Sequence, residues 1–162
     1  EICACLVGSE MCIRDRGKKS VDSIHKELGR VMWEYVGMGR TAEGLKTGLA
    51  KLKDIRKEFE TELFIPGAKE GMNIELDKAF RLDDFITMGQ LIAYDALNRE
   101  ESCGGHFREE HQTEEGEAKR DDENFFYVAC WEYQGSDDKA PVLYKEPLVY
   151  EAIKVQTRNY KS

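Results

Sequence analysis

The sequence changes character within the stretch Asn98-Arg-Glu-Glu-Ser-Cys-Gly-Gly-His-Phe-Arg-Glu-Glu110. Before it, apolar residues recur at the spacing of an α-helix, and after it the chain stays polar until an aromatic segment begins at Phe125. A paired glycine is typical of a helix end, because glycine accepts backbone angles that other residues avoid. The stretch therefore predicts a helix that runs into a polar surface loop carrying His106 and Arg108.

Two helical patterns precede this junction. In residues 20–36 apolar residues recur at steps of three and four, which predicts a helix with one buried stripe. Gly37 and Gly39 end that pattern, and Thr41 is a favourable N-cap for a second helix. The expected buried residues are Val21, Ile24, Leu28, Val31, Met32, Tyr35, Val36, Leu45, Leu49, Leu52, Ile55, Phe59 and Leu63.

A third helical pattern extends from Asn73 to about Glu101. Acidic residues in its first turn suit the positive end of a helix dipole. Three consecutive amphipathic helices with short connections pack most simply as an antiparallel bundle. The residues expected to be buried in this third helix are Leu76, Phe80, Phe85, Met88, Leu91, Ile92, Tyr94 and Leu97.

Beyond the junction the sequence favours strands. Residues 125–133 are rich in aromatic residues and predict a strand, in which Cys130 is expected to pack in the core. Residues 135–138 predict a turn. Residues 142–144 and 148–155 are further strand candidates, each preceded by a proline that places a break.

The chain has the size of one ordinary domain, at 162 residues. We expect a mainly α fold, with a three-helix antiparallel bundle over residues 17–102 and a loop with a small β-containing tail over residues 103–162. The net charge of −8 disfavours non-specific binding to nucleic acid or to anionic lipid, which both require basic residues. No apolar run approaches the ~20 residues needed to span a bilayer.

Residues 1–16 join no periodic pattern and contain three of the five cysteines. The string from Cys5 to Arg16 is similar to the translation of a common sequencing adapter, so we interpret residues 1–16 as a non-native leader. The alternative is a genuine leader, although its apolar run is brief and no basic region precedes it. The remaining Cys103 and Cys130 lack a metal-binding spacing and are expected to be reduced thiols.

The junction resembles the C-terminal domain of the succinate dehydrogenase and fumarate reductase flavoprotein subunits. In that family a helix ends in an Ala-Leu-x-Arg-x-Glu-Ser-Arg-Gly-Ala-His segment, and an Asp-Asp pair follows. The matching residues are Ala96, Leu97, Arg99, Glu101, Ser102, Gly104, His106, Arg108, Asp121 and Asp122. Cys103 stands in place of the usual arginine and Gly105 in place of the usual alanine. The resemblance continues more weakly from about Gly17 to the C-terminus.

The resemblance implies a subunit that exchanges electrons between succinate or fumarate and FAD, the physiological direction remaining open. FAD is expected to bind an N-terminal flavin domain rather than this region, so no catalytic, cofactor-binding or metal-binding residue is expected here. The implied partners are that flavin domain, an iron-sulfur subunit and, indirectly, a membrane cytochrome b subunit, at the cytoplasmic face of the cell membrane. The expected docking loop comprises Ser102, Gly104, Gly105, His106, Arg108, Asp121 and Asp122.

Three sequence motifs could each indicate a functional site, but each also has a simpler structural explanation. Residues 37–42 match the letters of a Gly-x-Gly-x-x-Ala dinucleotide fingerprint, but a helix precedes them where that motif requires a strand, which favours an interhelix turn. His106 and His111 with neighbouring glutamates offer metal ligands, although their spacing favours hydrogen-bonding roles. The acidic run in residues 109–123 offers general acids and bases, but most such runs are solvated surfaces. Arg108 is a candidate ion-pair partner of Asp121 or Asp122.

Two alternatives to the respiratory flavoprotein remain. One is the same domain in an L-aspartate oxidase or an adenylylsulfate reductase, since the resemblance places substrate selection outside this region. The other is a free-standing helical module for protein interaction with no redox partner, which predicts a surface without a large apolar docking patch.

Overall fold

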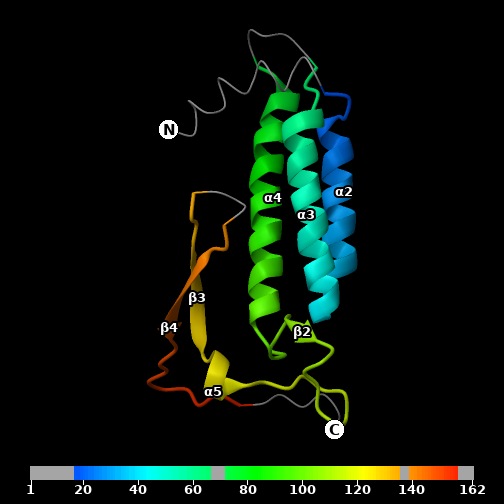
Figure 1. Cartoon of the computed structure of the whole chain (residues 1–162). Helices are drawn as coiled ribbons and strands as arrows, with labels where there is room; N and C mark the ends of the chain where they lie inside the picture. The colour runs from blue at the N-terminus through cyan, green and yellow to red at the C-terminus, as the bar shows by residue number, and fades with distance from the viewer. Residues whose placement is uncertain (1–16, 67–71, 136–138, 157–162) are drawn as a thin grey trace. The chain divides into compact units, whose positions relative to one another are not determined.

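The structure, a computed structural model, describes residues 17–66, 72–135 and 139–156 (Figure 1). The chain divides into two compact units, with the boundary between Asn98 and Arg99. The first unit is helical, and the second contains a short helix and a hairpin of strands. The predicted mainly α fold is therefore confirmed. The predictions for residues 1–16 and most of the turn at 135–138 fall outside the described residues.

The first two helices begin at capping residues, of which Thr41 was predicted. Helix α2 spans Val21–Val36, and the Ser20 hydroxyl accepts a hydrogen bond from the Ser23 amide at 3.2 Å. Helix α3 spans Ala42–Glu62, and the Thr41 hydroxyl accepts one from the Gly44 amide at 3.0 Å. Such side-chain acceptors satisfy amides that have no partner inside the helix, which explains why both helices begin there. The short strand β1, Gly39–Arg40, lies between them.

Helix α4 spans Ile74–Asn98, so it ends before the predicted limit at Glu101. Its start is fixed by Asn73, whose side-chain oxygen accepts hydrogen bonds from the amides of Glu75 at 3.0 Å and Leu76 at 3.2 Å. After Asn98 the side chain of Arg99 binds groups far along the chain, as described below, and the backbone leaves the helix.

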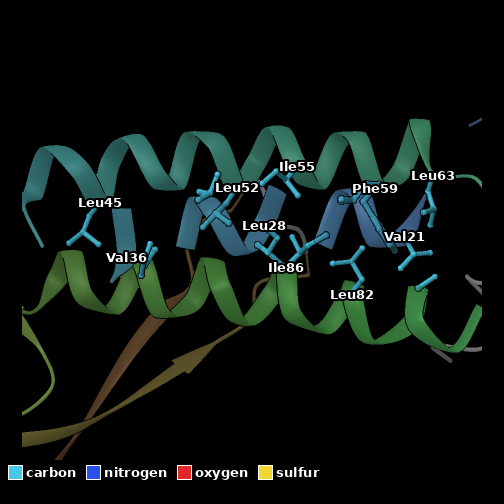
Figure 2. Packing of buried hydrophobic residues seen from close by; sticks show 14 of the residues in the cluster. Val21, Leu28, Val36, Leu45, Leu52, Ile55, Phe59, Leu63, Leu82 and Ile86 are labelled. Atoms are coloured by element: carbon cyan, nitrogen blue, oxygen red, sulfur yellow. The ribbon is translucent and has the colours of Figure 1, made fainter. Parts of the chain in front are cut away.

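The three helices enclose a single apolar core (Figure 2). Ion pairs add to this packing: Lys19, which precedes α2, binds Glu58 of α3 at 2.5 Å, and Arg56 of α3 pairs with Asp83 of α4. The predicted stripes of α2 and α3 are confirmed, with Met32, Tyr35 and Leu49 only partly buried. The buried residues are Val21, Ile24, Leu28, Val31, Val36, Leu45, Leu52, Ile55, Phe59, Leu63, Ile65, Ala79, Leu82, Ile86, Ala93 and Ala96.

The prediction for α4 is confirmed for Leu76 and Leu97, which pack against the core, and was wrong for its exposed residues. The large side chains of Phe80, Phe85, Met88 and Ile92 are exposed, and Leu76, Leu91, Tyr94 and Leu97 are only partly buried. The core is lined instead by Ala79, Leu82, Ile86, Gly89, Ala93 and Ala96, at alternating steps of three and four. A Cβ atom at Gly89 would lie 3.0 Å from the Met32 sulfur, so α2 approaches too closely for large residues here.

The second unit contains strand β2 at Phe107–Arg108, helix α5 at Asp122–Phe125, strand β3 at Tyr127–Glu132 and strand β4 at Val142–Pro147. Strands β3 and β4 pair antiparallel, in a register that runs from Tyr127 opposite Pro147 to Glu132 opposite Val142.

Three details of the predicted strands were wrong. Phe125 belongs to α5, because Asp121 caps that short helix. No strand forms at residues 148–155, and the predicted break at Pro147 is instead the last position of β4, where a missing amide is tolerated. Cys130 is exposed rather than packed in a core, because neither face of this two-stranded hairpin is fully buried in the described chain.

Candidate functional site

The polar segment between α4 and β3 is organised by buried hydrogen bonds. We call residues 99–122 the junction loop. It contains all seven residues predicted for the docking loop. Three of its polar or charged residues are buried, namely Glu101, Ser102 and Arg108. Buried polar groups of this kind are stable only where their hydrogen bonds are satisfied, so the loop has a defined conformation.

Arg99 is the centre of this network. Its Nη1 donates to Glu101 Oε1 at 2.7 Å and to the Phe125 carbonyl at 3.1 Å, and its Nη2 donates to the Tyr127 carbonyl at 3.1 Å. The guanidinium also lies 5.9 Å and 5.1 Å from the ring centroids of Phe125 and Tyr127, within the range of cation–π attraction. One side chain therefore holds the start of the loop against the start of β3.

Glu101 and Ser102 continue the network to the other side of the loop. The second carboxylate oxygen of Glu101 accepts a hydrogen bond from the Asp121 amide at 3.0 Å. The Ser102 hydroxyl accepts from the Arg108 amide at 2.8 Å and donates to the Arg108 carbonyl at 3.1 Å. The Ser102 amide donates to the Lys119 carbonyl at 2.9 Å. Both residues act on the backbone, and neither offers its side chain to solvent.

The paired glycines form a tight turn. The Cys103 amide donates to the His106 carbonyl at 2.8 Å, and the His106 amide donates back at 3.1 Å. Gly104 has a φ of +59°, which favours glycine over any residue with a Cβ atom. His106 Nε2 lies 2.9 Å from the Arg99 carbonyl oxygen, which only accepts, so this nitrogen carries the proton.

Arg108 and the two aspartates have partners other than those predicted. The Arg108 Nε donates to Glu110 at 3.2 Å, while Asp122 pairs with Arg120. Asp121 caps α5 by accepting from the side chain of Asn124 at 2.8 Å and from its amide at 3.2 Å. The hydrogen bond from the Asn124 side chain lowers the pKa of Asp121 from its ordinary value.

The predicted docking residues fall into two groups. Ser102 and Arg108 are buried and hold the loop in shape, whereas Gly104 and Gly105 form an exposed tip beside Cys103. A Cβ atom built at either glycine meets no atom within 4 Å, so the tip is open to a close approach by another backbone. The sequence-based prediction omitted Arg99 and Glu101, although both match the family motif and could have been found from it.

The Gly-x-Gly-x-x-Ala letters form a helix end, in agreement with the predicted interhelix turn. The side chain of Arg40 donates from Nε to the carbonyls of Val36 at 3.1 Å and Gly37 at 2.8 Å. These carbonyls close α2 and lack partners within the helix, so the arginine caps it. The preceding element is helix α2, so these residues do not fit the strand–turn–helix arrangement that holds a dinucleotide.

Metal binding requires a cluster of ligand side chains. Among the described residues, no group of three or more histidine, cysteine, aspartate or glutamate residues is placed to hold a metal ion. No helix in the described part of the chain is long and apolar enough to cross a membrane.

Comparisons with known proteins give consistent matches. Residues 25–160 match the family described as fumarate reductase flavoprotein C-term. The fumarate reductase flavoprotein subunit of a Serratia species is 32% identical over 113 residues, which are 70% of this chain and 18% of that protein. An uncharacterized FAD-dependent oxidoreductase of Methanocaldococcus jannaschii is 33% identical over 95 residues, or 59% of this chain and 16% of that protein.

The fold is also found in solved structures. Quinol fumarate reductase of E. coli superposes with a TM-score of 0.72 over 96% of this chain and 26% of that chain, at 21% identity. Adenylylsulfate reductase of Archaeoglobus fulgidus superposes with a TM-score of 0.66 over 85% of this chain and 20% of that chain, at 18% identity. Both matched chains are several times longer than the segment they share with this one.

Proposed function

Because the chain belongs to the family of fumarate reductase flavoprotein C-terminal domains, we propose that it completes a flavoprotein subunit that interconverts succinate and fumarate. The observation that carries this proposal is the match over residues 25–160, which includes both the helical unit and the junction loop. The network of half-buried Arg99 with buried Glu101 and Ser102 supports it, because these residues of the matched segment fix the path of the junction loop.

We assign the chain a bracing role against the flavin domain of the same subunit. The proposed contact is the docking loop of Ser102, Gly104, Gly105, His106, Arg108, Asp121 and Asp122. Its exposed tip supports this role, because two glycines allow another backbone to come close. The buried members of the loop keep the tip in one conformation, so less ordering entropy is lost on contact.

FAD supplies two-electron redox chemistry in such a subunit. The dinucleotide-like letters at residues 37–42 follow helix α2 rather than a strand, which supports assigning FAD binding to the flavin domain. The proposal extends to an iron-sulfur subunit and, through it, to a membrane cytochrome b subunit at the cytoplasmic face of the membrane. Solved relatives of this fold include quinol fumarate reductases, which supports membership in a larger complex.

An L-aspartate oxidase is the second candidate. The enzyme of Oryza sativa is 37% identical over 85 residues, which are 52% of this chain and 13% of that protein. The fumarate reductase assignment has wider coverage, at 70% of the chain, and agrees with the name of the matched family.

The proposal is tested by joining residues 17–162 to the N-terminal portion of the Serratia flavoprotein subunit. We expect the chimera to bind FAD and reduce fumarate with an artificial electron donor, whereas residues 17–162 alone should neither bind FAD nor oxidise succinate. Turnover by the isolated chain would overturn the assignment. A second chimera with the N-terminal portion of the rice L-aspartate oxidase tests the alternative, which gains support if only that chimera is active.

Arg99→Ala and Arg81→Ala form a matched pair within the active chimera. Arg99 holds the docking loop, whereas Arg81 makes an exposed ion pair with Asp77 on α4. The bracing role predicts that Arg99→Ala weakens FAD retention and that Arg81→Ala does not. Equal retention in both variants would show that the junction loop does not support the flavin domain.

A further inference from the structure

Helix α4 carries large apolar side chains on the side away from the core. Phe85, Met88 and Ile92 follow one another at steps of three and four, so they form one stripe along the helix. Their exposed fractions are 48%, 52% and 42%. A helix that is apolar on opposite sides is typical of one buried on both sides, and the other helices of the first unit cover only one side of α4.

The neighbouring helix α2 extends this apolar surface. His25 stacks on Phe85 with ring centroids 5.5 Å apart, which joins the two helices at one level. Gly29 and Trp33 follow His25 at steps of four, on the same side of α2. Trp33 is 85% exposed, although tryptophan is a residue whose burial contributes much to interfaces. We call His25, Gly29, Trp33, Phe85, Met88 and Ile92 the α2–α4 face.

Gly29 is a second, independent sign of a partner. A Cβ atom at Gly44, Gly48 or Gly89 would meet another atom at 2.9, 2.9 or 3.0 Å, so each of these helical glycines allows a close contact. At Gly29 a Cβ atom would meet nothing within 4 Å. Glycine in the middle of a helix is destabilising, and nothing in the described chain requires it at this position. A partner backbone that approaches Gly29 would account for it.

The solvent-facing side of helix α3, in the same bundle, is charged. Its exposed positions carry Lys46, Lys51, Lys53, Asp54, Lys57 and Glu60. Helix α3 has no exposed large apolar residue, so the stripe of Phe85, Met88 and Ile92 on α4 has no counterpart there. The apolar outer face is therefore a property of one side of the bundle and not of its general composition.

We propose that the α2–α4 face is a docking surface for an apolar segment of the flavoprotein subunit that lies outside residues 1–162. This inference rests on the proposed function and adds a second contact to the docking loop. The relatives leave ample chain to supply the segment, since this chain matches only 18% of the Serratia subunit. A second copy is the poorer occupant, because two chains of net charge −8 repel each other.

Hydroxyl-radical footprinting with mass spectrometry tests the proposal on the isolated chain and on the FAD-containing chimera. We expect the oxidation rates of Trp33 and Met88 to fall several-fold in the chimera, while Met72, which is 98% exposed, stays reactive. Gly29→Phe should restore oxidation of both side chains in the chimera. The matched control Lys53→Phe adds the same ring to the outer face of α3 and should leave them protected.

The possible outcomes distinguish a failure of the docking surface from a failure of the proposed function. A chimera that reduces fumarate but leaves Trp33 and Met88 fully reactive overturns the docking surface and leaves the function intact. Protection that appears in the isolated chain as its concentration rises assigns the face to a second copy instead. A chimera that never binds FAD overturns the function and the docking surface together.

Discussion

The guanidinium of Arg99 donates a hydrogen bond to the carbonyl of Tyr127 at 3.1 Å, across 28 residues of sequence. Arg99 is the first residue after α4, and Tyr127 is the first residue of β3. One side chain therefore joins the start of the junction loop to the start of β3. The loop is polar and rich in acids, yet this bond and the buried Glu101 carboxylate give it a fixed path.

We predict that Arg99→Ala destabilises the second unit by roughly 1.5–3 kcal/mol, the range for hydrogen bonds to charged groups. Arg99→Lys should recover only part of this, because a lysine ammonium does not reproduce the planar fork. Urea unfolding followed by Trp131 fluorescence in a Trp33→Phe background measures the effect. Arg81→Ala, which removes an exposed ion pair, should change stability by less than about 1 kcal/mol. Equal losses in the two variants would contradict the role of Arg99.

Opposite effects are expected from two glycine-to-alanine substitutions. Gly29→Ala adds helix propensity in open space, so it should stabilise the isolated chain by about 0.5–1 kcal/mol. Gly48→Ala places a methyl group 2.9 Å from the Tyr35 Cβ atom, and should destabilise the helical unit by about 1–3 kcal/mol. Chemical denaturation monitored by circular dichroism at the helix band compares them. A stabilising effect of Gly48→Ala would contradict the close packing of α2 against α3 at this position.

Leu82 and Met88 lie on opposite sides of α4 and should respond differently to truncation. Leu82→Ala empties a core position and should cost about 2–5 kcal/mol. Met88→Ala removes a side chain that is half exposed in the isolated chain, and should cost less than about 1 kcal/mol. Thermal unfolding of the isolated chain measures both. A larger loss for Met88→Ala would support the face first predicted from sequence.

The cap of α5 should weaken in acid. The pKa of Asp121 is lowered in the folded chain, because its carboxylate accepts a hydrogen bond from the Asn124 side chain. The stabilisation is therefore present above the unfolded pKa, near 3.8, and is lost as the pH falls through the lower folded pKa. Amide exchange at Asn124, followed by NMR, should accelerate at low pH beyond the intrinsic pH dependence.

Asp121→Asn provides the comparison for this prediction. The amide oxygen of asparagine still caps a helix but does not titrate, so the excess pH dependence at Asn124 should disappear. Asp84→Asn, on the exposed side of α4, should leave that dependence unchanged. Retention of the full pH response in Asp121→Asn would assign it to another group.

Much of the helical unit was accessible from local sequence. Thr41 was predicted as the cap of the second helix, and its hydroxyl accepts a hydrogen bond from the Gly44 amide as expected. The stripes of α2 and α3 were predicted correctly, because large apolar residues face the core and charged residues face outward. Within each of these helices, periodicity and burial carry the same information.

For α4 they do not. Leu82 and Ile86 face the core together with small residues such as Gly89, whereas Phe85, Met88 and Ile92 lie outside. Large apolar residues therefore occur on both sides of this helix, and side-chain size does not identify the side that faces the core. Only the distance between α2 and α4, which allows no side chain at Gly89, distinguishes them.

The junction loop likewise has some features that follow from local sequence and others that depend on the fold. Its polar character, its glycine turn and its family membership follow from residues that are neighbours in sequence, because turn and cap preferences are local. The partners of Arg99, Glu101 and Arg108 depended on the fold, because each charged group binds whichever carbonyl, amide or carboxylate is brought within about 3 Å. Local chemistry thus determined the elements and the class of protein, while packing decided which faces and which side chains remain available for contact.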